Sequence, residues 1–314
     1  MDSRNVAIVM DPPETISVDR DTTFALALEA ESRRFAVWAV DMNEMMIDHG
    51  RPGALVRRIG FKRDRPCYEW QSEKVRRMLD DFDYVLMRKD PPFDEKYFFA
   101  THMLSLCRKA VVLNRPASLR EAPEKLYALH FPLVNPPSVV TSDAKTIRDF
   151  LHKSPSGIVI KPLNRCGGSG ILYVEGRDRN FNSLVEIATD EGRSYIVAQH
   201  YLPEIKSGDK RVICVNGKPC GAVARIPDRE DHRGNIHTGA SVRPYELSAR
   251  DGWLLKQIEE RLRSDGLYFV GVDIIGDYIT EINVTSPTGI QEIQRLGGAD
   301  IAKIFWERID EFER

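Results

Sequence analysis

The stretch "FVGVDIIGDYITEINVTSP", residues 269–287, decides how the fold is interpreted. Apolar and polar residues alternate on both sides of a central Gly-Asp pair, which is typical of a β-hairpin. Glu281 and Asn283 are two residues apart and therefore project from one face of the second strand. Ile282 and Val284 project from the other face, into a core. Oxygen ligands on one face of a strand suit a hard cation such as Mg²⁺, so the hairpin predicts a cation site.

The register of this hairpin decides whether Asp273 belongs to the same site. A strict two-residue turn would pair Asp273 with Thr280 and aim it away from Glu281. A three-residue loop, or an equivalent bulge, would pair Asp273 with Glu281 directly. Two carboxylates that face each other repel, and a bound cation is a physical reason to keep them there. We predict a metal site made of Asp273, Glu281 and Asn283, and the alternative is a solvated polar face.

Length and composition limit the class of protein. The 314 residues are enough for two or three domains. With 45 Lys and Arg against 47 Asp and Glu, the chain has no overall basic field of the kind that drives nucleic-acid binding. The five cysteines form no CxxC pair, and no segment approaches the ~20 apolar residues of a membrane span. We therefore expect a cytoplasmic protein that binds neither nucleic acid nor membrane.

The first third of the chain alternates between strand-like and helix-like patterns, which favours a parallel α/β sheet. The expected strands are 5–10, 35–40, 83–89 and 110–114, and the expected helices are 21–34 and 95–109.

A polar, proline-bearing stretch around 114–123 is the best candidate for a domain boundary. We predict a first domain over 1–122 and a second over 123–314. In the second domain, strand-like runs are joined by short turns, with long helices expected at 248–264 and 299–312. That half therefore predicts an α+β fold with antiparallel sheets.

A glycine-rich connection follows Lys161 in "IVIKPLNRCGGSGILYV". Gly167, Gly168 and Gly170 would let backbone N–H groups approach an anion, and the lysine adds a positive charge. A strand follows the glycines, so the segment matches neither a P-loop nor a dinucleotide-binding turn. A phosphate-binding loop and a plain hairpin turn both stay open from these residues alone.

The strand that ends in "AQHYLP" has exposed backbone from Gln199 to Leu202, which could bind a flat heterocycle between Tyr201 and Leu202. An ordinary strand end is the alternative. The polar, glycine-bearing segment "ARIPDREDHRGNIHTGASVRP" predicts a mobile loop over 226–242 that closes over substrate. Its Arg225 and Arg233 suit bidentate capture of carboxylate or phosphate, and a charged loop without a role is the alternative.

Taken in order, Lys125, "IKPL" with its glycine loop, "AQHYLP", "DKRV", "ARIP", "RGN" and the opening hairpin resemble the ATP-grasp superfamily, and more narrowly the prokaryotic glutathione synthetases. "VMDPPETISVDRDTTFALALEA" and "YVLMRKDPPFDEKYFFAT" are similar to that family's N-terminal segments. The resemblance implies an ATP-grasp fold behind a Rossmann-like α/β domain. It also implies a homotetrameric ligase that uses ATP and Mg²⁺, with Mn²⁺ as the alternative metal, to join glycine to γ-glutamylcysteine through an acyl phosphate.

The resemblance further implies four groups of site residues. For the ATP phosphates these are Lys125, Lys161, Gly167, Gly168, Ser169 and Gly170. For adenine and ribose they are Gln199, Tyr201, Leu202 and Asp209. The metal ligands are Asp273, Glu281 and Asn283. The residues at the reacting centre or the substrate carboxylates are Arg211, Arg225, Arg233 and Ser286.

The chain departs from the family pattern at two loops. The glycine loop has Asn164-Arg165 where an Asp-Gly pair is expected, and its Cys166 raises the hypothesis that oxidation impairs ATP binding. In the lid, "IHTGA" replaces small residues and a Gly-Gly pair, so His237, Thr238 and Ala240 bear on substrate specificity. An ATP-grasp ligase for another small carboxylate or amine therefore stays open, as does a non-catalytic ATP-binding regulator.

Overall fold

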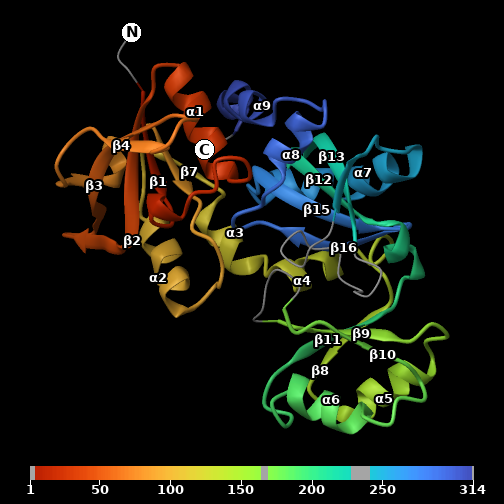
Figure 1. The fold of residues 1–314 in the computed structure, drawn as a ribbon. Coiled ribbons are helices and arrows are strands. Elements are labelled where there is room, and N and C mark those ends of the chain that lie inside the picture. The colour runs from red at the N-terminus through yellow and green to blue at the C-terminus, as the bar shows by residue number, and fades with distance from the viewer. Residues whose placement is uncertain (1–3, 164–168, 228–240, 313–314) are drawn as a thin grey trace.

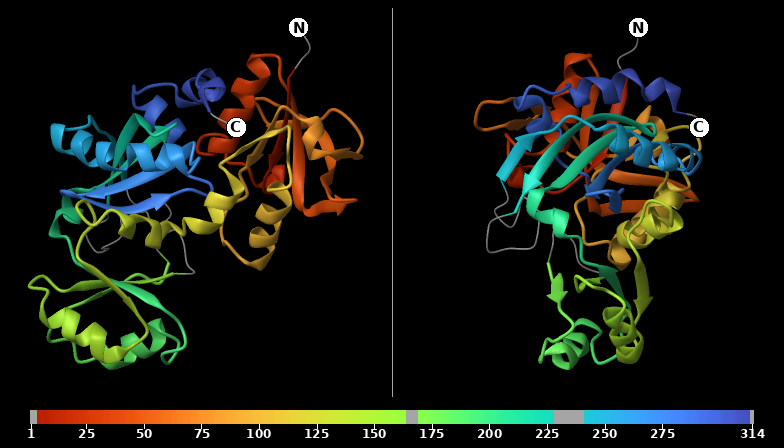
Figure 2. Two further views of the ribbon diagram at one scale, coloured as in Figure 1. Left: turned by 180° about the vertical axis from the view of Figure 1, so that it is seen from behind. Right: turned by 90° about the vertical axis from the view of Figure 1, so that its right-hand side faces the viewer.

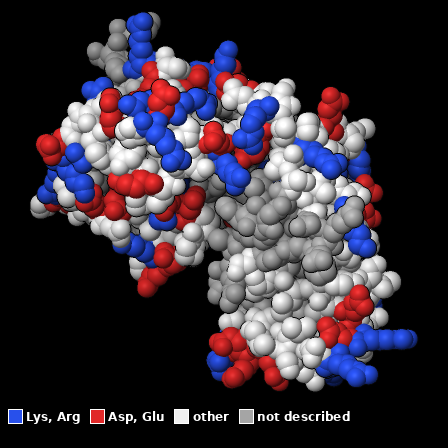
Figure 3. Space-filling model, in the orientation of Figure 1, with Lys and Arg blue, Asp and Glu red and all other residues white. Residues whose placement is uncertain are grey.

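The computed structural model describes residues 4–163, 169–227 and 241–312. Its strands form three sheets (Figure 1): a seven-stranded sheet near the N-terminus, a five-stranded sheet beside it, and a four-stranded sheet in a separate lobe. Within the described ranges, no helix has both the length and the apolar character needed to cross a membrane. Basic and acidic side chains are interspersed over the upper part of the face drawn in Figure 3.

The N-terminal sheet has the order β4-β3-β2-β1-β6-β7, and β5 also pairs with β3. Its parallel strands were predicted from the sequence: β1 (Asn5–Val9), β2 (Ala36–Asp48), β6 (Tyr84–Met87) and β7 (Val111–Leu113). The antiparallel strands were missed: β3 (Arg51–Phe61), β4 (Tyr68–Trp70) and β5 (Val75–Met78). The sheet is therefore mixed, because β3 returns beside β2 instead of crossing over through a helix.

Helices α1 (Thr22–Ser32), α2 (Glu95–Leu104) and α3 (Pro116–Glu121) belong to the N-terminal lobe. Asp21 and Asp94 cap the first two helices by accepting backbone N–H groups. The C-terminal helix α9 (Ile301–Glu307) packs on α1, where Trp306 donates to the Leu26 carbonyl at 2.8 Å. Both views in Figure 2 show this return of the chain end to the N-terminal lobe.

The five-stranded sheet is antiparallel throughout, in the order β14-β13-β12-β15-β16. Its strands are β12 (Asp209–Val215), β13 (Lys218–Ile226), β14 (Ser241–Pro244), β15 (Phe269–Ile275) and β16 (Tyr278–Asn283). Helices α7 (Ala249–Ser264) and α8 (Ile290–Arg295) pack against β13. A capping box between Ser248 and Asp251 starts α7 at the predicted place.

The four-stranded sheet is also antiparallel, as predicted, in the order β10-β9-β11-β8. Its strands are β8 (Ser138–Thr141), β9 (Ile158–Pro162), β10 (Leu172–Val174) and β11 (Ile196–His200). Helices α5 (Ala144–His152) and α6 (Phe181–Ala188) share a core with one face, and the other face is turned toward the five-stranded sheet (Figure 1). The short helix α4 (Glu124–Tyr127) lies between the two sheets.

Short 3-10 helices connect several of these elements. They span Pro13–Thr15, Leu79–Asp81, Ala128–His130, Pro203–Ser207 and Ile309–Glu311.

The β15–β16 hairpin has a two-residue turn and a bulge. Next to the turn, Ile275 pairs with Tyr278 and Ile274 pairs with Ile279. The next pair is Asp273 with Glu281, so Thr280 is the extra residue of the bulge. The Thr280 hydroxyl donates to the Asp273 carbonyl at 3.3 Å. The bulge was one of the two predicted ways to bring Asp273 opposite Glu281, and it is confirmed.

Candidate functional site

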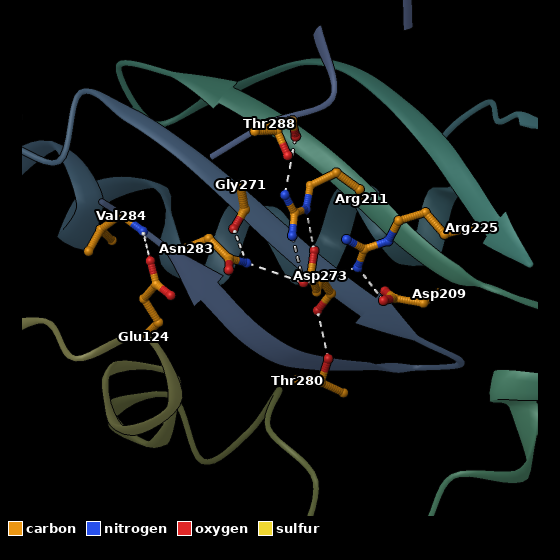
Figure 4. Close-up of polar contacts among 10 residues, drawn as sticks. All are labelled: Glu124, Asp209, Arg211, Arg225, Gly271, Asp273, Thr280, Asn283, Val284 and Thr288. Atoms are coloured by element: carbon orange, nitrogen blue, oxygen red, sulfur yellow. Dashed lines mark hydrogen bonds and ion pairs between the residues drawn. The ribbon is translucent and has the colours of Figure 1, made fainter. Parts of the chain in front are cut away.

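Asp273 lies at the centre of a buried group of charges on the five-stranded sheet (Figure 4). Arg211 binds it in bidentate fashion, with Nε 2.5 Å from Oδ1 and Nη2 3.0 Å from Oδ2. Arg225 Nη2 lies 3.0 Å from the same Oδ2 and also donates to Asp209. All four side chains are less than a tenth exposed. Two cations and two anions alternate, so each buried charge has an opposite charge beside it.

The two carboxylates of this charge cluster have opposite pKa shifts. Burial raises the pKa of Asp209, although Arg225 works against the shift. Burial alone would also raise the pKa of Asp273, but Arg211 and Arg225 hold it well below its usual range. Among the described residues, Asp209 Oδ1 and Arg225 Nε have no hydrogen-bond partner. Such buried polar atoms are places where a ligand or a water can bind.

Strand β16 presents the predicted cation ligands. Glu281 and Asn283 are partly exposed, whereas Ile282 and Val284 are fully buried, which confirms the alternation expected from the sequence. Asn283 Nδ2 donates to the Gly271 carbonyl at 3.1 Å and to Asp273 Oδ2 at 3.2 Å. The polar face of β16 is thus aligned with Asp273 on the neighbouring strand.

These residues fit a hard cation only as part of a mixed ligand set. Within the described part of the chain, no three His, Cys, Asp or Glu side chains are grouped closely enough to hold a metal ion. Asp273 already accepts from both arginines and from Asn283. A cation here would therefore bind first to Glu281 and the Asn283 amide oxygen, with phosphate oxygens completing the shell.

Lys161 approaches this region from β9 of the four-stranded sheet. Its Nζ donates to Gln199 Oε1 at 2.8 Å, and Gln199 Nε2 in turn donates to the Ser138 hydroxyl at 3.0 Å. The pKa of Lys161 lies below its usual value because the side chain is buried, and the charge of Glu281 opposes part of this shift. Lys161 therefore lies within electrostatic reach of Glu281 on the polar face of β16.

Lys125, on α4, reaches the same strand. Its Nζ lies 3.5 Å from Glu281 Oε1, and its side chain is only 10% exposed. Lys125 and Lys161, which are 36 positions apart in the sequence, are therefore both within electrostatic reach of Glu281. A pair of cations beside a carboxylate face is suited to bind a polyphosphate together with a divalent cation.

Tyr201 and Leu202 follow the end of β11, on the lobe that carries Lys161. The Tyr201 ring lies 4.4 Å from the Tyr173 ring, and its backbone N–H donates to the Gly157 carbonyl at 3.0 Å. Leu202 is partly exposed. Aromatic and aliphatic surface therefore lies near Gln199, at the place where a heterocycle was expected.

The remaining predicted residues divide between described and undescribed segments. Ser169 is exposed, and Gly170 has a positive φ of 74°. The Ser286 hydroxyl donates to the Arg88 carbonyl at 3.4 Å. The predicted site residues Gly167, Gly168 and Arg233 lie outside the described residues. So do Cys166 and the lid positions that depart from the family pattern, His237, Thr238 and Ala240.

Two family models match the chain. The one described as "Prokaryotic glutathione synthetase, N-terminal domain" matches residues 5–120, and the one described as "Prokaryotic glutathione synthetase, ATP-grasp domain" matches residues 124–298. The chain belongs to the prokaryotic glutathione synthetase family. The predicted resemblance is therefore confirmed.

Curated relatives of this glutathione synthetase family member carry the same family name. The chain is 43% identical over 307 residues to the glutathione synthetase of Synechococcus elongatus, covering 94% of this chain and 95% of the relative. It is 39% identical over 308 residues to that of Agrobacterium fabrum, covering 98% of this chain and 96% of the relative.

Solved structures of other ligases share the fold. The D-cycloserine synthetase DcsG aligns with a TM-score of 0.67 at 16% identity, covering 98% of this chain and 99% of that one. A Chryseobacterium gregarium RiPP-associated ATP-grasp ligase aligns with a TM-score of 0.67 at 15% identity, covering 99% and 98%. The glutathione synthetase family member therefore has the ATP-grasp fold that its sequence predicted.

Two polar residues at this site were not singled out from the sequence. Arg88, in the "MRKDPPFD" motif, is buried and donates to the Pro287 carbonyl at 3.2 Å, so it holds the segment that carries Ser286. Glu124 accepts three hydrogen bonds from Val284 and Thr285, just beyond β16, the strand that carries the predicted cation ligands Glu281 and Asn283. The motif itself was a signal for Arg88, but the Glu124 contacts span about 160 positions and no local pattern indicates them.

Proposed function

We propose that this chain joins glycine to γ-glutamylcysteine in an ATP-dependent reaction that yields glutathione, ADP and phosphate. Membership of the glutathione synthetase family and relatives of that name at about 40% identity support this function. The structural observation that carries it is the position of Lys125, 3.5 Å from Glu281 on the polar face of β16, with Lys161 within electrostatic reach of the same carboxylate. The site thus has cations for phosphates and oxygen ligands for a divalent metal, which is Mg²⁺ in this proposal.

The reaction is an acyl transfer that passes through a phosphorylated intermediate. An oxygen of the dipeptide's C-terminal carboxylate, on its cysteine residue, attacks the γ-phosphorus of ATP, and ADP leaves. The neutral glycine amine then attacks the acyl carbon and forms the new carbon–nitrogen bond. The carbon–oxygen bond to phosphate breaks, phosphate leaves with its electron pair, and the nitrogen gives up one proton. Because ATP supplies the leaving group, no covalent enzyme nucleophile is needed. The protein contributes positioning and charge neutralisation.

We assign the residues to the partners of this reaction as follows. Lys125, Lys161, Ser169 and Gly170 bind the ATP phosphates, with Gly167 and Gly168 in the same loop. Gln199, Tyr201 and Leu202 border the adenine, and Asp209 lies near the ribose. Asp273, Glu281 and Asn283 form the Mg²⁺ site, and bound Mg²⁺ neutralises charge on the phosphates. Arg211, Arg225, Arg233 and Ser286 bind the substrate carboxylates or face the reacting centre.

Asp273 holds both arginines in place. Each guanidinium has a partner in the charge cluster, so neither is an uncompensated buried cation. Arg211 also donates to the Thr288 carbonyl at 3.1 Å, which fixes its planar group in the sheet. Prearranged donors of this kind cost little reorganisation when a substrate carboxylate binds.

Three further parts of the proposal come from the sequence: composition and pattern support the domains, the lid and the cytoplasmic location, and the family resemblance implies the oligomer. The chain divides into domains over 1–122 and 123–314, with a lid over 226–242. The enzyme forms a homotetramer, and it works in the cytoplasm.

Phosphate release by the purified protein tests the proposed reaction. ATP and Mg²⁺ are supplied with γ-glutamylcysteine alone, with glycine alone, and with both. Phosphate release that requires both substrates, together with a product of the mass of glutathione, is expected. Release only with another carboxylate and amine would replace the substrates, and tight ATP binding without release under any condition would contradict a ligase.

A further inference from the structure

We propose that Glu124 is a positioning residue that holds Lys125 against the cation strand β16 and so controls nucleotide affinity. The inference rests on the proposed function, because it takes Lys125 as a phosphate ligand. It concerns a carboxylate that contacts neither phosphate nor metal in the assignment above.

Glu124 closes the end of β16 with one oxygen atom (Figure 4). Its Oε1 accepts from the Val284 N–H at 3.2 Å, from the Thr285 N–H at 3.3 Å and from the Thr285 hydroxyl at 2.8 Å. These donors come directly after Asn283, where the chain leaves the ladder of the sheet. The carboxylate therefore replaces the backbone partners that the strand loses at its end.

Two adjacent residues of α4 thus bracket the cation ligands. Glu124 holds the positions just after Asn283, and Lys125 lies 3.5 Å from Glu281, two positions before it. Because the two side chains leave neighbouring backbone positions, moving one relative to β16 moves the other. The distance between the Lys125 ammonium and the cation ligands is therefore set by Glu124.

Helix α4 is too short to hold this position by itself. It has four residues, follows Pro123, and receives no side-chain cap at its N-terminus. Its far end is fixed by the Tyr127 hydroxyl, which donates to Asp265 at 2.8 Å. Glu124 thus attaches the end that carries Lys125 to the residues after β16, beside the Lys125–Glu281 ion pair, and an isolated turn of helix has little stability of its own.

The competing explanation is that Glu124 only stabilises the fold. A stabilising contact alone would lower the melting temperature without changing how Lys125 meets a nucleotide. A positioning contact acts through Lys125, so its effect on affinity disappears once the ammonium is gone. A double-mutant cycle separates the two cases.

The test measures binding of ADP in the presence of Mg²⁺ by calorimetry, using the full chain. Glu124→Ala is expected to raise the Kd about tenfold in the wild-type background and less than about twofold in the Lys125→Met background. Glu124→Gln, which keeps an acceptor oxygen, should stay within about threefold of wild type. The exposed Glu121→Ala on α3 is the matched control and should leave the Kd unchanged.

Equal increases in Kd in both backgrounds, or no increase in either, would overturn the positioning role. Wild-type protein that binds no ADP would overturn the proposed function as well, so the two failures differ. If Glu124→Ala does not fold, Thr285→Val removes the hydroxyl donor and should raise the Kd about threefold. An unchanged Kd in that variant would also overturn the proposal.

Discussion

The two sheets that border the site hold their charged side chains in different ways. On the five-stranded sheet, Arg211, Asp273, Arg225 and Asp209 hold one another, and each is a full charge removed from water. On the four-stranded sheet, Lys161 is held by the neutral amide of Gln199. Loss of Asp273 leaves a buried arginine without its carboxylate partner in the first case, whereas loss of Lys161 leaves an unpaired amide in the second. Substitutions in the charge cluster of the five-stranded sheet should therefore lower the free energy of unfolding, whereas substitution of Lys161 on the four-stranded sheet should mainly weaken nucleotide binding.

Asp273→Asn should give the largest effect on stability, because it removes the carboxylate that both arginines share. We expect the free energy of unfolding to fall by about 3–5 kcal/mol in urea titrations. Asp277→Asn, at the exposed turn of the same hairpin, is the control and should change stability by about 0.5 kcal/mol or less. Similar losses in both variants would show that the buried charge cluster is no more important to stability than an exposed carboxylate of the same hairpin.

Glu281→Gln should separate catalysis from stability on the same sheet. Glu281 is partly exposed and lies outside the charge cluster, but its loss takes the carboxylate from beside the largely buried Lys125, so we expect the free energy of unfolding to fall by about 1–2 kcal/mol. Turnover should fall on the order of a hundredfold because a cation-binding charge is lost. Phosphate release assays compare this variant with Glu260→Gln on the exposed side of α7. Near-normal turnover in Glu281→Gln would remove it from the metal site.

Lys161→Met tests the other sheet. We expect the Kd for ADP with Mg²⁺ to rise about tenfold, because a charge-assisted phosphate contact is lost. Stability should fall by only about 1 kcal/mol, since the lost partner of Gln199 is offset by relief from burying the ammonium. Lys145→Met, exposed on α5 of the same lobe, controls for loss of a charge. A stability loss as large as that of Asp273→Asn would contradict the comparison.

The smallest effect is a pH dependence from Asp209. Burial raises its pKa from 3.8 to about 6, so the folded chain binds more protons there than the unfolded chain between these values. The stability of wild type relative to Asp209→Asn should therefore fall as the pH rises from about 4 to about 6. Urea titrations across this range measure the difference. A difference that is constant or grows would show that Arg225 dominates the carboxylate instead.

The comparison also separates what the sequence could and could not predict. The faces of β16 followed from alternation, because Ile282 and Val284 need a core while Glu281 and Asn283 do not. The pairing of Asp273 with Glu281 was predicted for either of two turns, and the bulge at Thr280 was not distinguishable from a longer loop, because both give the same pattern of polar and apolar residues.

Contacts between distant segments were not predictable in the same way. Asp209 was placed near the ribose, and its ion pair with Arg225 arises only once β12 and β13 are paired. Strand β3 was missed because Pro52, Gly53 and Gly60 weaken its strand pattern. The hydrogen bonds of Glu124 to Val284 and Thr285 depend on where α4 lies relative to β16, which is decided by packing.

The most direct test of the proposed ligation follows one oxygen atom. γ-Glutamylcysteine labelled with ¹⁸O in its terminal carboxylate is turned over with glycine, ATP and Mg²⁺, and the released phosphate is analysed by mass spectrometry. An acyl phosphate requires that one labelled oxygen appear in phosphate for each glutathione formed. Phosphate without label would contradict activation of the carboxylate by ATP at this site.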